Sequence, residues 1–214
     1  MKSRAAKYIV GIDEVGRGAL AGPVVVAAAC IPVGLKISNR KLGALKDSKK
    51  LSPKLRKLWV EHFKSIPEIS YKVARVYPRA IEKINISQAA NRAASIASEH
   101  LIEFMSAASK QHPYKLEFVR MFEIFLDGGL YIKNQADFNA KTVIKADEKI
   151  TAVKVASIIA KVQRDRYMEK LSKKYPRYGF GIHKGYGTRS HIRIIRKYGA
   201  SNKVHRLTFL QKIK

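Results

Sequence analysis

The chain has 214 residues, which suits one domain with a buried core and is short for two. Hydrophobic residues make up 46%, with 13 Gly and 7 Pro, and this composition excludes a collagen-like or broadly disordered chain. The 43 Lys and Arg against 16 Asp and Glu leave a formal net charge of +27, which repels itself unless a polyanion shares the surface. A nucleic acid is therefore the first partner to consider.

Cysteine usage and hydropathy indicate the compartment of the protein and whether it spans a membrane. The single cysteine, Cys30, cannot form an internal disulfide, and no Cys/His pair has the spacing of zinc ligands. The longest apolar run, residues 24–31, is far shorter than the ~20 residues that a membrane helix needs. We expect a cytoplasmic protein without a membrane span, and the self-repulsion of its charge favours a monomer.

Basic residues concentrate late in the chain. Residues 149–214 carry 18 Lys and Arg against 2 Asp and Glu, whereas residues 1–148 carry 25 against 14. No internal repeat, low-complexity block or linker marks a domain boundary. We predict one domain, with a body over residues 1–174 and a basic helical segment over residues 175–214.

Strand and helix patterns alternate along the chain. Dense β-branched residues punctuated by Gly and Pro predict strands at 7–15, 23–31, 71–76, 122–126 and 141–146, the first two forming a possible hairpin. Apolar periodicity predicts helices from Pro53, where Ser52 is the N-cap, and over 87–105 and 152–174. This alternation predicts an α/β fold with helices on both faces of a sheet.

Four of the scarce carboxylates stand where the predicted strands end: Asp13, Glu14, Asp127 and Asp147. The strand at 7–15 has apolar residues on both sides, so an acid that continues it loses hydration unless it is paired or bound to a metal. Strand ends are also where α/β sheets form ligand sites. Because hard cations take carboxylate oxygen, these acids predict a Mg²⁺ or Mn²⁺ site.

Each acid alone has a simpler explanation. An aspartate followed by glycine, as at Asp127, is a generic turn signal, and the others could cap helices or pair with the abundant Lys and Arg. Asp13 and Glu14 are adjacent, so on a regular strand they point to opposite faces and share a site only if the strand bends. Gly16 and Gly18 make such a bend plausible.

Four motifs together resemble one known family. They are Gly-Ile-Asp-Glu-Val-Gly-Arg-Gly-Ala-Leu-Ala-Gly-Pro at 11–23, Asp-Ser-Lys-Lys-Leu-Ser at 47–52, Ala-Ser-Ile-Ile-Ala-Lys-Val at 156–162 and His-Lys-Gly-Tyr-Gly-Thr at 183–188. Their order and approximate spacing resemble ribonuclease HII over residues 8–209. The resemblance implies a ribonuclease H-like mixed central sheet flanked by helices. It also implies an endonuclease that hydrolyses the RNA strand of RNA–DNA hybrids and cuts 5′ of ribonucleotides embedded in duplex DNA.

The resemblance assigns roles residue by residue. It implies that the four acids hold two divalent ions, Mg²⁺ or Mn²⁺, and that Gly16, Arg17 and Gly18 read the ribose 2′-hydroxyl. It further implies that Tyr186 stacks at the RNA–DNA junction and that Lys49 contacts a phosphate. Ala19 stands where the family often has Pro, and Ala146 and Glu148 differ from its commonest Gly and Ser. Ribonuclease HIII usually has Lys at the Arg17 position, so type II is favoured.

Residues 154–168 present a polar face of a helix next to the last proposed metal ligand. Polar or basic residues recur on it at three- and four-residue spacing, and Ser157, Lys161 and Arg164 are the predicted phosphate contacts. The alternative is a solvated face. For His183, His191 and His205 we expect structural or phosphate-contact roles, since hydrolysis through two metal ions needs no histidine base.

Hydrolysis through two ions predicts products with a 5′-phosphate and a 3′-hydroxyl. Two rival functions are open at this point: a non-catalytic basic protein that binds RNA or DNA, and a ribonuclease H-like relative that cuts DNA. The charge alone does not separate them. The acids favour an enzyme, because a pure phosphate binder gains nothing from four carboxylates beside its anionic ligand.

Overall fold

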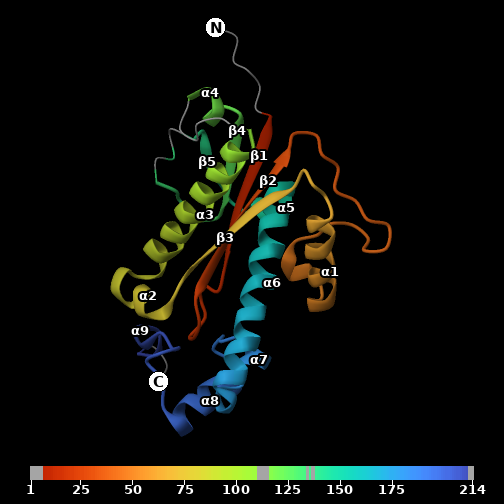
Figure 1. Cartoon of the computed structure of the whole chain (residues 1–214). Coiled ribbons are helices and arrows are strands. Elements are labelled where there is room, and N and C mark those ends of the chain that lie inside the picture. Colours follow the sequence, from red (N-terminus) through yellow and green to blue (C-terminus); the bar gives the residue numbers. More distant parts are fainter. Residues whose placement is uncertain (1–6, 110–115, 134, 136–137, 212–214) are drawn as a thin grey trace.

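The computed structural model describes residues 7–109, 116–133, 135 and 138–211. Within these residues the centre is a five-stranded mixed sheet in the order β3-β2-β1-β4-β5 (Figure 1). The strands are β1 (Tyr8–Val15), β2 (Val24–Pro32), β3 (Ser70–Val76), β4 (Phe122–Asp127) and β5 (Ala140–Val143). β1 and β2 pair antiparallel, as predicted, and so do β2 and β3, whereas β4 runs parallel to both β1 and β5.

Helices surround the sheet and continue beyond it. They are α1 (Pro53–Lys64), α2 (Pro78–Ile84), α3 (Ile86–Ser109), α4 (Leu116–Val119), α5 (Ala146–Lys149), α6 (Thr151–Lys174), α7 (Phe180–His183), α8 (Arg189–Tyr198) and α9 (Leu207–Leu210), with 3₁₀ turns η1 (Ser48–Lys50) and η2 (Pro176–Tyr178). The predicted N-cap of α1 is confirmed, since the Ser52 hydroxyl accepts the Leu55 N–H at 3.2 Å and Pro53 follows it.

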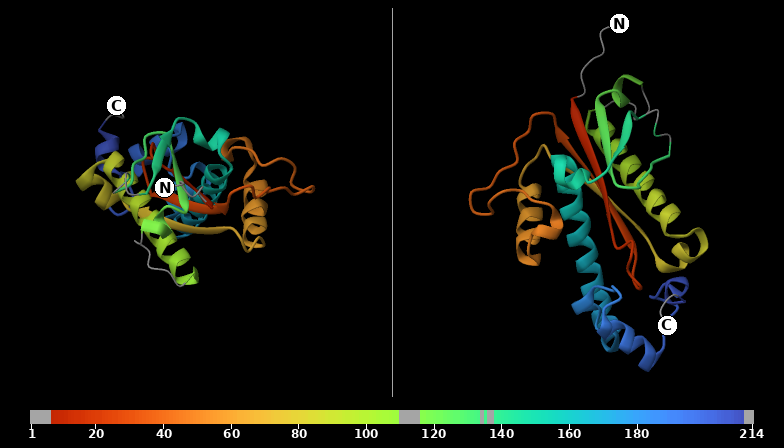
Figure 2. Two further views of the ribbon diagram at one scale, coloured as in Figure 1. Left: turned by 90° about the horizontal axis from the view of Figure 1, so that it is seen from above. Right: turned by 180° about the vertical axis from the view of Figure 1, so that it is seen from behind.

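The two faces of the sheet bury separate cores, as predicted. α3 packs on one face and α6 with α1 on the other (Figures 1 and 2). Val10 and Ile12 of β1 belong to the core under α3, and Ile9 packs against the core under α6. The expectation that β1 is buried on both faces is therefore confirmed.

α6 lies directly against β1, and this brings the chain before it to the strand ends. A Cβ at Gly11 would lie 2.2 Å from the backbone of Ala152 and Val153, so glycine is required for this approach. α5 immediately precedes α6 and carries Asp147. The close packing at Gly11 therefore determines how near Asp147 lies to β1.

The elements after α6 form a small cluster of their own at its far end (Figure 2). Ala21, Met168, Tyr178, Phe180 and Val204 share a buried apolar core there. The backbone of residues 20–22 also joins the C-terminal elements, through a bridge between Ala21 and His205. Helices α7, α8 and α9 lie within this part of the chain, and the division into a body over residues 1–174 and a basic helical segment over residues 175–214 of the same domain stays a prediction.

One local prediction was wrong, and one helix was not predicted. The strand predicted at 141–146 ends at Val143, because Lys145 adopts a left-handed conformation (φ 56°) and the chain turns into α5. Asp147 therefore stands on a one-turn helix rather than at a strand end. α2 was not predicted, although Pro78 at its first position is a helix-start signal.

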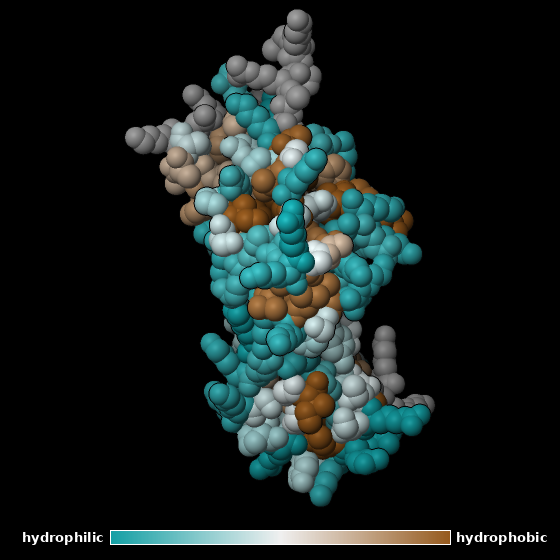
Figure 3. Space-filling model, turned by 90° about the vertical axis from the view of Figure 1, so that its right-hand side faces the viewer, coloured by the Kyte–Doolittle hydropathy of each residue, from teal (hydrophilic) through white to brown (hydrophobic). Residues whose placement is uncertain are grey.

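No helix among the described residues is long and apolar enough to cross a membrane. The face of the molecule in Figure 3 is largely hydrophilic, and apolar side chains appear on it as separate patches.

Candidate active site

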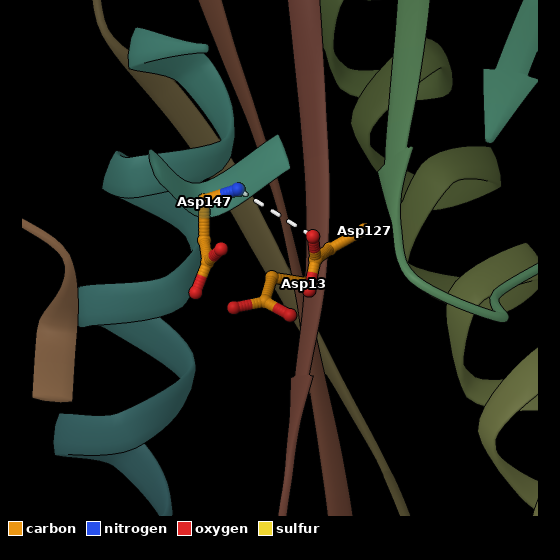
Figure 4. Close-up of side chains that lie close together, drawn as sticks. All are labelled: Asp13, Asp127 and Asp147. Carbon is orange, nitrogen blue, oxygen red and sulfur yellow. Dashed lines mark hydrogen bonds between the residues drawn. The ribbon is translucent and has the colours of Figure 1, made fainter. Parts of the chain in front are cut away.

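Three aspartates from different elements converge at one edge of the sheet. Asp13 is on β1, Asp127 ends the parallel neighbour β4, and Asp147 is on α5; each points toward the others (Figure 4). One carboxylate oxygen from each lies within 4.8 Å of the other two. We call Asp13, Asp127 and Asp147 the acid cluster. Parallel pairing explains two of its members, since neighbouring parallel strands end at the same edge.

Asp127 positions the third member through the backbone. Its Oδ1 accepts the N–H of Ala146 at 2.6 Å and that of Asp147 at 3.5 Å. These N–H groups open α5, where no side chain of the N-cap residue Lys145 satisfies them. Asp127 therefore holds the start of α5 in the place from which Asp147 joins the cluster.

The carboxylates of the cluster are costly to ionise together. Burial raises the pKa of Asp13 well above its usual range; a hydrogen bond from Ser157 lowers it, and the charge of Asp127 raises it. Burial also raises the pKa of Asp147, with Asp127 and Asp47 adding to the rise. Desolvated like charges at this separation favour a bound cation.

Glu14 lies beside the cluster rather than within it. Its Oε1 accepts from the Arg17 guanidinium at 3.2 Å, while its Oε2 is buried and has no hydrogen-bond partner among the described residues. Burial raises the pKa of Glu14, Arg17 lowers it and Asp127 raises it. The expectation that the adjacent Asp13 and Glu14 point in different directions is thus partly confirmed. Asp13 belongs to the acid cluster, whereas Glu14 presents one oxygen without a partner among the described residues at its border.

This set of donors fits Mg²⁺ or Mn²⁺. All of its ligand atoms are carboxylate oxygens, which hard divalent cations prefer, and nitrogen or sulfur ligands that would favour zinc are absent from the cluster. The unpartnered Glu14 Oε2 adds a fourth carboxylate oxygen without a protein donor. The residues present therefore suit the metal that the sequence predicts.

Lys49 and Asp47 border the cluster from η1. The Lys49 ammonium lies 3.6 Å from Asp147 Oδ2, and its side chain is 83% exposed. Desolvation opposes the charge of Lys49, but Asp147, Asp47 and Asp13 together raise its pKa. Lys49 is thus an exposed cation beside the cluster, as a phosphate contact requires. Asp47 is buried, N-caps η1 through Lys49 N and had no predicted role, although the Asp-Ser-Lys motif contains it.

The loop between β1 and β2 presents Gly16, Arg17 and Gly18 next to the acids. Gly16 has φ +90°, and a Cβ there would lie 2.1 Å from Arg164 Nε, so the position requires glycine. Gly18 is exposed, and nothing lies within 4 Å of a Cβ built on it. The Arg17 side chain is 36% exposed and also donates to Ser87 on α3 at 2.9 Å.

The structure corrects part of the predicted polar face of α6. Arg164 is 0% exposed, and its Nε, Nη1 and Nη2 donate to the carbonyls of Pro23, Lys184 and Ala21. The predicted phosphate contact at Arg164 is therefore wrong in this structure, because backbone carbonyls occupy its guanidinium.

Ser157 and Lys161 have different surroundings on the same face of α6. Ser157 is 4% exposed and its hydroxyl donates to that of Ser48 at 2.8 Å, so it faces the protein interior instead of a phosphate. Lys161 is partly exposed and pairs with Asp165 at 2.8 Å. Of the three predicted contacts on α6, Lys161 alone keeps an accessible cation.

Tyr186 lies on the turn after α7, half-buried against basic side chains. Its ring centroid lies 5.1 Å from the Arg164 guanidinium and 5.9 Å from the Lys161 ammonium. The Gly185 carbonyl accepts from the N–H groups of Leu20 and Ala21, which ties this turn to the loop of Gly16. Residues 16–21 and 183–186, distant in sequence, thus form one surface beside the acid cluster.

A group of buried polar side chains supports that surface from beneath. We call this group the C-terminal polar core; it consists of Arg164, Arg206, His183, His191 and His205. The rings of His183 and His191 stack at 4.0 Å, and His191 Nε2 lies 3.2 Å from His205 Nε2. His191 Nδ1 contacts the Tyr186 carbonyl at 2.9 Å. These contacts give the three histidines a structural role, which is one of the two roles expected for them.

Arg206 is the functional candidate that the sequence reasoning missed. It is fully buried and donates to the carbonyls of Arg17 and Gly22, yet it lies about 190 residues from them in the chain. Nothing in the local sequence distinguishes it from the many exposed arginines. Only the long-range bridge between Ala21 and His205 places it there.

Known proteins are similar to this chain along almost its whole length. A family model of ribonuclease HII matches residues 10–212. A curated Ribonuclease HII of Caldicellulosiruptor bescii is 42% identical over 208 residues, covering 97% of this chain and 88% of the relative. One of Campylobacter concisus is 40% identical over 207 residues, covering 96% and 95%.

Solved structures share the fold. The crystal structure of ribonuclease H2 from Pyrococcus horikoshii OT3 superposes with a TM-score of 0.64 at 28% identity, covering 96% of each chain. RNase HII of Archaeoglobus fulgidus, solved in a PCNA:RNase HII complex, has a TM-score of 0.59 at 26% identity, covering 92% of this chain and 93% of that one. A Bst-RNase HIII structure in complex with Mn²⁺, at 22% identity, a TM-score of 0.58 and coverage of 95% and 67%, shows the fold alone.

A carboxylate cluster at the edge of this sheet, beside a basic surface, defines a nuclease of ribonuclease H-like fold, and the predicted fold class is confirmed. The chain belongs to the ribonuclease HII family. It is a type II ribonuclease H, an endonuclease that degrades the RNA strand of RNA–DNA hybrids. The non-catalytic alternative is thereby excluded.

Proposed function

We propose that this ribonuclease also cuts on the 5′ side of single ribonucleotides embedded in duplex DNA, leaving 5′-phosphate and 3′-hydroxyl ends. One observation carries the proposal. The exposed Gly18 and the half-buried Tyr186 lie on one surface, and Arg17 joins that surface to Glu14 beside the acid cluster. A site that inspects one sugar next to the reacting phosphate needs only one ribonucleotide.

Asp13, Glu14, Asp127 and Asp147 are proposed to hold two divalent ions, Mg²⁺ or Mn²⁺. When bound, such ions activate the attacking water and offset the charge on the leaving 3′ oxygen. The protein's own contribution is preorganisation: Asp127 fixes α5 through its N–H groups, and Ser157 supports Asp13. Lys49 offers a cation to a phosphate oxygen that arrives beside Asp147.

Selection of a ribonucleotide requires contact with the 2′-hydroxyl, which DNA lacks. Gly18 lets the backbone approach a sugar edge where a side chain would collide, and Arg17 can hold the adjacent phosphate with its planar fork. Tyr186 is proposed to stack against the sugar or base at the junction between the ribonucleotide and DNA. Lys161, below its ring, adds a positive charge on the same side.

The C-terminal elements are proposed to hold the flanking duplex. No Asp or Glu occurs after Glu169. Arg189, Arg193 and Lys197 of α8 are exposed, whereas His191 on the same helix is buried. These cations can contact phosphates without reading sequence, which suits an enzyme that acts wherever a ribonucleotide occurs. That the protein is a cytoplasmic monomer stays a prediction.

The test is cleavage of a DNA duplex that contains one ribonucleotide, with Mg²⁺, Mn²⁺ or EDTA. We expect wild type to cut 5′ of the ribonucleotide with either metal, and neither the EDTA reaction nor Asp127→Asn to give product. Glu103→Gln, a matched loss of one exposed carboxylate on α3, should cleave like wild type.

Two results would contradict the proposal. Cleavage in EDTA would exclude metal-dependent hydrolysis, and a 2′,3′-cyclic phosphate product would show that the ribose hydroxyl is the nucleophile. Cleavage of long hybrids without any incision at a single ribonucleotide would leave the family activity intact and refute the finer substrate assignment.

A further inference from the structure

Arg206 is buried beneath the loop of Gly16, Arg17 and Gly18. Its Nη1 donates to the Arg17 carbonyl at 2.9 Å, while its Nε and Nη2 donate to the Gly22 carbonyl at 3.1 and 2.9 Å. The planar guanidinium thus binds the loop at two carbonyls, those of Arg17 and Gly22, which are five residues apart. A lysine ammonium could not make this pair of contacts with the same geometry.

The contact at the Arg17 carbonyl determines where the next N–H group points. The peptide bond between Arg17 and Gly18 is trans, since the described residues contain no cis peptide. In a trans peptide the carbonyl and the following N–H point in opposite directions. Arg206 holds the carbonyl inward, so the Gly18 N–H points outward.

The outward side of Gly18 is open. Gly18 is exposed, and a Cβ there would meet nothing within 4 Å. Among the described residues no hydrogen-bond acceptor is recorded for the Gly18 N–H, whereas the neighbouring Ala19 N–H donates to Gly16 O at 3.4 Å. A donor fixed in direction and left without a protein acceptor suits an oxygen of an incoming ligand.

Arg206 is maintained at a cost. Its guanidinium is 0% exposed and donates only to carbonyls, with no carboxylate among its recorded hydrogen-bond partners. Burial lowers the pKa of Arg206 to about 9, and the charge of Arg164 also lowers it. A buried cation of this kind is expensive where an apolar side chain could fill the same volume. This desolvation cost is explained if the direction of the peptide between Arg17 and Gly18 matters for function.

We propose that Arg206 is a positioning residue for ribose recognition: through the Arg17 carbonyl it aims the Gly18 N–H at the 2′-oxygen of the substrate. This inference rests on the proposed function of the Gly16–Gly18 loop. The 2′-hydroxyl oxygen accepts the Gly18 N–H, and 2′-deoxyribose offers no acceptor oxygen there. Arg206 touches neither substrate nor metal ligand, and its effect is confined to how well the enzyme distinguishes the two sugars.

The experiment compares the affinity of Arg206→Ala and Arg206→Lys for two duplexes that differ only in one ribonucleotide. Binding is measured by fluorescence anisotropy in EDTA, so that cleavage does not interfere. We expect wild type to prefer the ribonucleotide duplex and both variants to lose about 10-fold of that preference, the scale of one hydrogen bond to a buried or oriented donor. Affinity for the all-DNA duplex should change little.

A matched control separates positioning from general loss of stability. Arg56 is another buried arginine, 7% exposed, that donates to the carbonyls of Ser48 and Leu51 away from the loop. Arg56→Ala should lower the melting temperature while keeping the wild-type preference for the ribonucleotide. Guanidinium chloride at millimolar concentration should restore the preference to Arg206→Ala by occupying the vacated space, with no effect on Arg56→Ala.

The possible results separate the role of Arg206 from the proposed function. A folded Arg206→Lys with the full wild-type preference would overturn the role of Arg206, and so would an equal loss of preference in Arg56→Ala. If Arg206→Ala does not fold, Arg206→Lys decides alone. If wild type cleaves the single-ribonucleotide duplex while the Arg206 variants discriminate normally, the proposed function stands and this inference fails; if wild type does not cleave it, both fail.

Discussion

The acid cluster and the C-terminal polar core are two buried polar regions that lie on either side of the Gly16–Gly18 loop, and their charges are compensated in opposite ways. In the cluster, carboxylates raise one another's pKa, and at its border Glu14 Oε2 has no hydrogen-bond partner among the described residues. In the polar core, arginines and histidines donate to backbone carbonyls. The cluster needs a cation from outside, whereas the polar core is complete and can hold the loops in advance of substrate.

This difference predicts opposite dependences of stability on pH. An acid with a raised pKa keeps its proton to a higher pH in the folded state than in the unfolded chain. The contribution of Asp13 to the free energy of unfolding therefore falls as pH rises above 3.8, the usual pKa of an aspartate. A histidine with a lowered pKa has the reverse effect and destabilises the fold as pH falls.

The largest effect is expected at Asp13. Asp13→Asn should reduce cleavage by about 10³-fold, because a carboxylate ligand of the reacting centre is lost. The same change should raise the free energy of unfolding in EDTA at pH 7, since a buried charge that repels its neighbours disappears. Cleavage kinetics and urea unfolding measure the two effects. A variant that is inactive and also destabilised would show that the cluster is not electrostatically strained.

Loss of a buried arginine should instead damage the fold. Arg164→Met leaves the carbonyls of Pro23, Lys184 and Ala21 without their donors. At ~1–3 kcal/mol for each unsatisfied buried group, we expect the free energy of unfolding to fall by about 3 kcal/mol or more. Lys57→Met, at an exposed position on α1, should change it by less than ~0.5 kcal/mol. Equal urea midpoints for the two variants would contradict the interpretation of Arg164.

The buried histidines should make the protein less stable at acidic pH, the opposite of the effect of Asp13. Burial lowers the pKa of His191 from 6.5 to about 4, with the charges of His183 and His205 adding to the effect. As pH falls from 6.5 to about 4, the unfolded chain gains a proton that the folded His191 does not, so the free energy of unfolding should fall by about 3 kcal/mol across this window and then level off. His191→Asn should flatten this slope in denaturation experiments from pH 7 to pH 4; an unchanged slope would assign it to other groups.

Two glycines of one loop should respond differently. Gly16→Ala forces a left-handed φ of +90° and a Cβ 2.1 Å from Arg164 Nε, so it should cost about 1–3 kcal/mol of unfolding free energy. Gly18→Ala meets open space and should keep the wild-type melting temperature while weakening binding of the ribonucleotide duplex. Equal melting temperatures for the two variants would mean that Arg164 moves aside.

The smallest effect is expected at the exposed Lys49. Lys49→Gln should raise KM a few-fold and reduce the salt dependence of binding by about one phosphate contact, with a small change in stability. Since Lys49 also lowers the pKa of Asp147, the variant should need a slightly higher pH for half-maximal activity. Lys54→Gln, on the exposed start of α1, is the matched control and should behave like wild type. A salt slope equal to that of wild type would remove Lys49 from the substrate interface.

Local predictions succeeded where the pattern alone determines the structure. β1 alternates apolar residues on both sides, and the N-cap of α1 follows from Ser52 and Pro53, so both were predictable. Predictions failed where a distant group redirects the chain. The strand predicted at 141–146 stops early because Asp127 binds the N–H groups that begin α5.

By itself the sequence determined the alternating strands and helices, the identity of the acids and the family to which the motifs belong, because periodicity and motif chemistry are carried by residues near one another in the chain. The tertiary structure alone decided that Arg164 serves the fold, that Glu14 stands outside the acid cluster and that Arg206 reaches Arg17. The reason is physical: burial and the choice of hydrogen-bond partner depend on which distant segments meet. An arginine that meets water and one that meets carbonyls look alike in the sequence.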